Sequence, residues 1–150
     1  MKIYIAKDAG YCFGVRDAVN LAYDTAKTHG EVYMLGTIVH NERVIEDLSK
    51  VGAKVVDSLG DVPDNKPLLF RAHGTAPQLW REASDRNLKL IDATCPLVTE
   101  IHHEIKKLEN ENRRTIIIGD HGHDEVVAIA AQVKKPIIIS SIEAVSYTHL

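Results

Sequence analysis

Two cysteines and four histidines lie in short loops that each follow an apolar, strand-like run of the sequence. These loops hold Cys12, His40, His73, Cys95 and one cluster of His121, His123 and Glu125. Thiolates and imidazoles bind metals, carboxylates transfer protons, and loops at helix N-termini bind anions. The residue types therefore indicate metal or iron-sulfur chemistry on an anionic substrate.

The segments that must position these side chains alternate between short apolar runs and longer helical patterns. We expect strands over residues 2–6, 31–35, 53–56, 68–71, 88–92, 115–119 and 136–140. Strands separated by helical patterns are typical of an α/β fold with mostly parallel sheets and flanking helices. Because the carboxyl ends of parallel strands meet at one edge, the loops should converge on a single crevice.

Two segments give sharper local predictions. Val15, Ala18, Val19, Ala22 and Ala26 recur with the period of a helix, which predicts a helix with one buried stripe that ends at Gly30. The run 115–119 is apolar throughout, which predicts a strand covered on both faces.

Composition excludes several classes of protein. The 150 residues are 45% hydrophobic, which is enough to form the core of one domain, or of one domain and part of a second. The net charge of -3 leaves no basic surface that would bind nucleic acid. No apolar run reaches the length of a membrane span, and the N-terminus does not resemble a signal peptide. We expect a cytoplasmic protein, in which the two cysteines are reduced rather than joined in a disulfide.

The two cysteines occupy equivalent places, each just before the first turn of an expected helix. The positive end of a helix favours the thiolate that binds iron or zinc. Buried, inert thiols are the alternative, since free cysteine is among the most buried residue types. The matched positions of Cys12 and Cys95 at strand ends favour the chemical role.

The eight histidines divide into two groups. His29 lies at a helix C-terminus, His102 and His103 lie among charged residues on what we expect to be a solvated helix face, and His149 lies in the tail. The four loop histidines are better read as ligand contacts, because imidazoles and helix N-termini together suit a phosphate or diphosphate. No nucleotide-binding glycine motif is present.

Five motifs together resemble the IspH or LytB family of 4-hydroxy-3-methylbut-2-enyl diphosphate reductases. They are AGYCFGV (Ala9–Val15), GTIVHN (Gly36–Asn41), RAHG (Arg71–Gly74), DATCPLV (Asp92–Val98) and GHDEV (Gly122–Val126). Their order and loop contexts agree as far as about Val145. Two departures stand out: the family commonly has His-Pro-Glu where this chain has His-Asp-Glu, and the family's third domain is absent.

The resemblance implies an oxygen-sensitive reductase of the non-mevalonate isoprenoid pathway with a 4Fe-4S cluster held by three cysteines. Cys12 and Cys95 would be two of the three, and the third is expected outside this chain. His40, His73 and His123 would bind the diphosphate of the allylic substrate, and Glu125 would deliver protons to the departing hydroxyl. His121 would contact these residues and not the substrate itself.

The resemblance also implies partners and a domain plan. A ferredoxin- or flavodoxin-type protein would donate the electrons, and neither nucleic acid nor a membrane would be bound. We expect one complete α/β domain over residues 1–95 and an incomplete second over 96–150. Residues 147–150 continue no helical or strand pattern, so we expect them not to be native sequence, and we expect the chain alone to be an inactive fragment.

Two alternatives remain open on the residues alone. Cys12, Cys95 and two loop histidines could form a zinc site of the Cys2His2 type, either structural or hydrolytic. The chain could also be a non-catalytic phosphate-binding module. Glu125 in particular could do no more than favour the dipole at the start of a helix.

Overall fold

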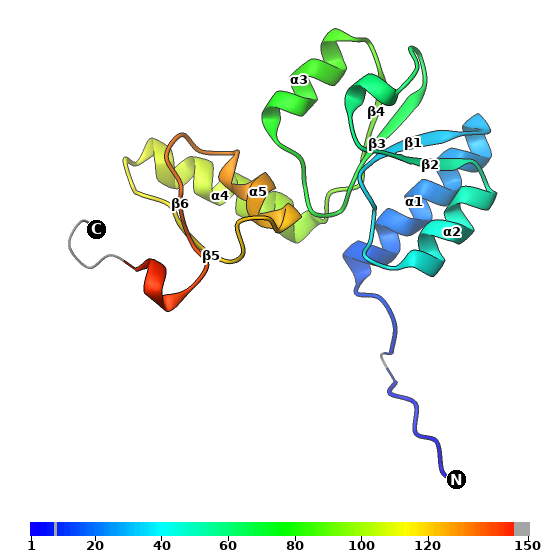
Figure 1. The fold of residues 1–150 in the computed structure, drawn as a ribbon, viewed down its shortest axis with the longest axis horizontal. Coiled ribbons are helices and arrows are strands. Elements are labelled where there is room, and N and C mark those ends of the chain that lie inside the picture. The colour runs from blue at the N-terminus through cyan, green and yellow to red at the C-terminus, as the bar shows by residue number, and fades with distance from the viewer. Residues whose placement is uncertain (8, 146–150) are drawn as a thin grey trace.

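Two parallel sheets with helices packed beside them make up the chain (Figure 1). The computed structural model describes residues 1–7 and 9–145. The strands are β1 (Val32–Leu35), β2 (Ala53–Val56), β3 (Pro67–Phe70), β4 (Lys89–Asp92), β5 (Ile116–Ile118) and β6 (Ile137–Ile139). The helices are α1 (Phe13–His29), α2 (Glu42–Lys50), α3 (Pro77–Asp85), α4 (Pro96–Asn110) and α5 (Asp124–Ala130), with short 3-10 turns η1 (Leu59–Asp61) and η2 (Ile142–Ala144).

The four-stranded sheet has the order β2-β1-β3-β4, and β5 pairs with β6 in the second sheet. Every pair of neighbouring strands is parallel. The predicted α/β fold with parallel sheets and flanking helices is therefore confirmed. Among the described residues, no helix is both long and apolar enough to cross a bilayer.

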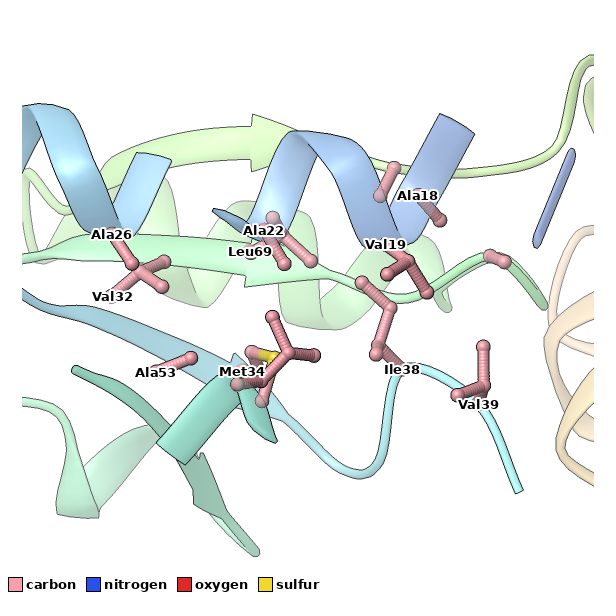
Figure 2. Packing of buried hydrophobic residues seen from close by; sticks show 13 residues of the cluster. Ala18, Val19, Ala22, Ala26, Val32, Met34, Ile38, Val39, Ala53 and Leu69 are labelled. Carbon is pink, nitrogen blue, oxygen red and sulfur yellow. The ribbon is translucent and has the colours of Figure 1, made fainter. Parts of the chain in front are cut away.

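Helix α1 covers one face of the larger sheet, as its stripe of small side chains predicts. Ala22 and Ala26 are buried in the same cluster as Val32 and Leu69, and Figure 2 shows the helix side chains directed at the strands. Gly30 ends the helix at φ 76°, a left-handed conformation that glycine adopts without strain. Both the buried stripe and the glycine end are confirmed.

The opposite face of this sheet packs against α3. Side chains alternate between the faces of a strand, so Tyr33, Leu68 and Phe70 point away from α1. Phe70 contacts Trp80 of α3 with 4.5 Å between ring centroids. Helices on both faces explain why these strands read as continuous apolar runs.

The strand expected over residues 2–6 is absent, so this prediction is wrong. Residues 1–7 form no strand and run away from the sheets in Figure 1. Ile3 and Ile5 are 73% and 84% exposed. An apolar run becomes a strand only where a neighbouring strand satisfies its backbone, and no strand of the described residues pairs with it.

The prediction that the run 115–119 is covered on both faces is also wrong. Ile117 is partly buried, whereas Ile116 and Ile118, which point to the other face, are 46% and 86% exposed. Strand β5 therefore has one open face among the described residues.

Glu31 forms ion pairs with two lysines in or beside the larger sheet, and these pairs should make the stability of the fold depend on pH in the acid range. Its carboxylate lies 2.9 Å from Nζ of Lys54 and 2.5 Å from Nζ of Lys66. These hydrogen bonds lower the pKa of Glu31 from 4.5 to about 2. The stabilisation is complete above pH 4.5 and is lost as the pH falls towards 2, because the unfolded chain then binds a proton that the folded chain does not.

Thermal unfolding followed by circular dichroism between pH 7 and pH 2 checks this expectation. Glu31→Gln should flatten the fall in melting temperature below pH 4.5. Glu82→Gln, at an exposed carboxylate of α3 without an ion pair in the described chain, should keep the fall of the wild type. Equal profiles for the two variants would contradict the assignment.

Candidate functional site

The loops that carry the predicted site residues converge beside the ends of β3 and β4. The backbone N–H of Cys95 donates to the carbonyl of Ala72 at 2.9 Å, which places the second cysteine beside the loop of His73. Cys12 and Cys95 are the N-cap residues of α1 and α4. The expected helix positions of both cysteines are confirmed, although no strand precedes Cys12.

A cavity of about 380 Å³ contains four of the predicted residues: Cys12, His73, Cys95 and Glu125. Its remaining wall is apolar, with residues from the first two turns of α1 and α4 and from the loop after β3. We call it the thiol cavity. Both thiols are free.

Gly14 makes room for one of these thiols. A Cβ atom at position 14 would lie 2.5 Å from Sγ of Cys95, closer than a real Cβ contact allows. A side chain at position 14 would therefore displace the sulfur of Cys95, which lies 81 positions further along the chain, the difference between 95 and 14.

Three of the loop histidines form one group beside this cavity. The ring centroids of His40 and His73 are 5.1 Å apart, and those of His73 and His123 are 6.1 Å apart. Burial lowers the pKa of His73, and the neighbouring His40 lowers it further. His73 is therefore neutral at neutral pH, and its buried Nδ1 has no hydrogen-bond partner among the described residues.

His123 is fixed by a bond to its own helix. As the N-cap of α5, its Nδ1 accepts the backbone N–H of Glu125 at 3.2 Å. A neutral ring that accepts at Nδ1 carries its proton at Nε2. The bond thus leaves Nε2–H of His123 free to donate to an anion.

Sequence reasoning missed an ion pair that joins the two sheet regions at this site. Nη1 of Arg71, just after β3, lies 2.6 Å from Oδ2 of Asp124 at the start of α5, and Nε2 of His40 lies 3.8 Å from the same oxygen. The guanidinium packs over Gly36, where a Cβ would lie 2.7 Å from Nη1 of Arg71 and would displace it. Arg71 offsets the negative charge that Asp124 brings to the histidines.

The grouping with metal-ligand geometry contains no cysteine. His40, His73 and Asp124 each offer an atom within 4.8 Å of the others, in a search of residues 1–7 and 9–145. The guanidinium of Arg71 already pairs with this carboxylate. The thiols of the Cys2His2 alternative do not join such a group in the described chain.

The histidines outside this group differ in how well their predicted exposure agrees with the structure. His102 is only 8% exposed, so the prediction of a solvated position is wrong, and burial lowers its pKa. His102 lies one helical turn beyond the buried Val98, on the same face of α4. This spacing indicates burial, but the neighbouring charged residues suggested an exposed face. His29, His103 and His121 are exposed, and His149 lies outside the described residues.

The pair of Arg71 and Asp124 should contribute to stability. Their side chains are 27% and 26% exposed, between a surface pair and a buried one. We expect Asp124→Asn to lower the free energy of unfolding by about 1 to 2 kcal/mol in urea titrations. Asp47→Asn, which breaks an exposed pair with Lys50, is the control and should change little. A change no larger than the control's would contradict a bridging role.

Comparison with known proteins gives one consistent family. The sequence profile described as LytB protein matches residues 3–149. A 4-hydroxy-3-methylbut-2-enyl diphosphate reductase of Cutibacterium acnes is 47% identical over 126 residues, covering 83% of this chain and 39% of the relative. One of Wigglesworthia glossinidia brevipalpis is 37% identical over 150 residues, covering 97% and 48%. The chain thus spans less than half the length of these relatives.

Solved structures agree with the sequence relatives. The E-1-hydroxy-2-methyl-but-2-enyl-4-diphosphate reductase of Plasmodium falciparum superposes with a TM-score of 0.89 at 34% identity, covering 92% of this chain and 44% of that one. A second structure, of the terminal enzyme of the non-mevalonate pathway, gives a TM-score of 0.82 at 32% identity, covering 94% and 52%.

Proposed function

Because the chain belongs to the LytB protein family, we propose that it forms the N-terminal part of an iron-sulfur reductase for 4-hydroxy-3-methylbut-2-enyl diphosphate. In the proposed reaction the substrate takes up two electrons and two protons and loses its hydroxyl as water, which leaves isopentenyl or dimethylallyl diphosphate. The observation that carries the proposal is the cavity shared by Cys12, His73, Cys95 and Glu125.

The residues present fit a 4Fe-4S cluster. Two thiols at helix N-caps share one cavity with apolar walls, and Gly14 leaves space for the sulfur of Cys95. Cys12 and Cys95 would hold the cluster together with a third thiolate from outside this chain. When bound, the cluster would pass two electrons, one at a time, from an external donor protein to the substrate, and it would supply an iron that acts as a Lewis acid on the hydroxyl.

His40, His73 and His123 are proposed to bind the diphosphate. Their rings lie in one group, and Nε2–H of His123 is free to donate. Each charge-assisted hydrogen bond to a phosphate oxygen contributes about 1.5 to 3 kcal/mol. Arg71 supports this role because it offsets the charge of Asp124.

Glu125 is proposed to deliver a proton to the departing hydroxyl. It lines the thiol cavity, and its backbone N–H holds the ring of His123. The proton donor and a diphosphate contact are thus fixed by the same turn of α5. A carboxyl group that only favoured the helix dipole would not need to line the same cavity as the two thiols.

We also propose a domain boundary near Cys95, with one unit over residues 1–95 and a second that begins at 96. The two sheets support this division, because the larger one ends with β4 at Asp92 and the smaller one begins with β5. The thiol cavity takes side chains from both sides of this boundary.

Binding of inorganic pyrophosphate tests the histidine roles without any cluster. We expect His73→Ala to weaken binding to this chain by about tenfold or more in calorimetric titrations, since one contact to a charged oxygen is lost. His29→Ala, at the exposed end of α1, removes an imidazole far along the helix from the site and should change the affinity less than about twofold. Equal losses in the two variants would contradict a local contact.

The function itself is tested in a chimera that joins this chain, after Val145, to the remaining part of the Cutibacterium acnes relative. After anaerobic reconstitution, and with dithionite added as the chemical electron donor, we expect iron, sulfide, a brown colour and conversion of the substrate to the two products. A colourless protein with stoichiometric zinc and no turnover would support the Cys2His2 alternative. Pyrophosphate binding without iron or turnover would support a phosphate-binding module.

A further inference from the structure

A second cavity lies on the other flank of α4 from the thiol cavity. Leu97 and Ile101 of α4 line the thiol cavity, whereas Thr99, His103 and Lys106 line the second one. Positions 97 and 99 are about 200° apart around a helix, so the two cavities share this helix as a wall. The second cavity has a volume of about 330 Å³. We call it the rear cleft.

The rear cleft lies between the two sheet regions. Helix α3 and the loops after β3 and β4 line one side, and α4 and the end of α5 line the other. Ligand sites occur preferentially at such junctions, in cavities of about 300 to 1,000 Å³. The rear cleft is at the lower end of this range, which suits a small molecule.

The charge of the rear cleft is positive. Arg81 and Lys106 lie at its rim and form no ion pair with any residue of the described ranges, and His103 lies beside them. Asp92 is the sole carboxylate among the described lining residues. Its Oδ1 already accepts the backbone N–H and the hydroxyl of Thr94, at 2.9 and 2.5 Å. An anion would therefore meet free cations.

A buried histidine and two threonines line the inner part of the rear cleft. His102 is 8% exposed, and its Nε2 has no partner in the described part of the chain. The hydroxyl-bearing side chains of Thr75 and Thr99 also line the cleft. Nε2 of His102 is shielded beside Gly74, so the ring contributes to the lining of the cleft and not a hydrogen bond to a ligand.

One wall of the rear cleft is apolar and fixed in place. Trp80 and Pro77, from the first turn of α3, line it. The indole ring packs on Phe70 in the core of the larger sheet, so it presents a rigid surface. A ring or other flat apolar group can pack against such a surface.

We propose that the rear cleft binds a small phosphorylated molecule with a flat or apolar portion, at a site separate from the thiol cavity. The phosphate lies against Arg81 and Lys106, and the apolar portion lies against Trp80. The occupied cleft touches both loops of the thiol cavity, because Thr94 directly precedes Cys95 and Thr75 follows His73 by two positions. This site does not depend on the proposed reductase function.

Phenyl phosphate, which joins one phosphate to one flat ring, is the probe. Amide chemical shifts of this chain, followed by NMR, should move and saturate at Thr94, Thr99 and His103. Arg81→Gln and Lys106→Gln should each weaken binding by about tenfold or more. Lys107→Gln is the matched control, because it removes the same charge from the same helix at a residue outside the cleft that pairs with Glu104.

Three outcomes would overturn the proposal: shifts that do not saturate, equal losses in all three variants, and shifts confined to the group of His40, His73 and His123. The last would mean that the probe binds only at the proposed diphosphate contacts. Unchanged dispersion of the amide signals in Arg81→Gln and Lys106→Gln shows that both variants are folded, and binding of pyrophosphate is measured separately. Failure at the rear cleft is thereby distinguished from failure of the proposed function.

Discussion

The 150-residue chain, reconstituted anaerobically with iron and sulfide, is expected to hold no stable 4Fe-4S cluster and to show no measurable turnover. It has two cysteines, so at least two of four irons would lack a thiolate. Side chains beside the thiol cavity are also open to solvent, with Phe13, Leu97 and Ile101 between 40% and 53% exposed. Water and oxygen would reach any iron bound there.

The chimera with the Cutibacterium acnes relative, reconstituted in parallel, provides the comparison. Iron and sulfide content, the visible spectrum and product formation are measured on both proteins under the same conditions. The chimera should hold the cluster and lose it when either Cys12 or Cys95 is replaced by serine. A stable cluster and turnover from the short chain would show that a third thiolate is dispensable.

Glu125→Gln in the same chimera should lower turnover by about 100-fold or more. The amide keeps the size of the side chain and the backbone bond to His123, but it has no proton to deliver to the hydroxyl. Cluster content and pyrophosphate affinity should stay within about twofold of the parent, because neither depends on that proton.

Glu100→Gln is the control for this substitution, since Glu100 is an exposed carboxylate on α4 outside the thiol cavity. It should leave turnover unchanged. Normal turnover by Glu125→Gln would mean that the proton comes from elsewhere. A loss of cluster in that variant would instead assign Glu125 a role in holding the site together.

The strands that the sequence predicted correctly are those whose partners lie within the described chain. The apolar runs of β1 and β3 are buried on both faces between α1 and α3, and such burial leaves a clear mark in the sequence. The run 2–6 has an equally good pattern but no strand beside it. A local pattern reports what a segment can form, whereas pairing depends on what lies next to it.

The sequence also predicted only part of the candidate site. Parallel strands place their loops at one edge, and four of the predicted residues, Cys12, His73, Cys95 and Glu125, line one cavity there. The pair of Arg71 and Asp124 spans 53 positions and two sheets, and no local signal joins such residues. The burial of His102 depends on which face of α4 packs against the rest of the chain. The charged residues on either side of His102 suggested the solvent-exposed face.

Because of the close approach between Gly14 and Cys95, we expect these two positions to change together during evolution. Any side chain at position 14 would displace the sulfur, so drift at the glycine is blocked for as long as the cysteine is kept. If a lineage lost the thiol, alanine or serine could enter at position 14 at little cost. A homologue that keeps both cysteines but has a larger residue in place of this glycine should therefore hold the sulfur of the second cysteine in a different position.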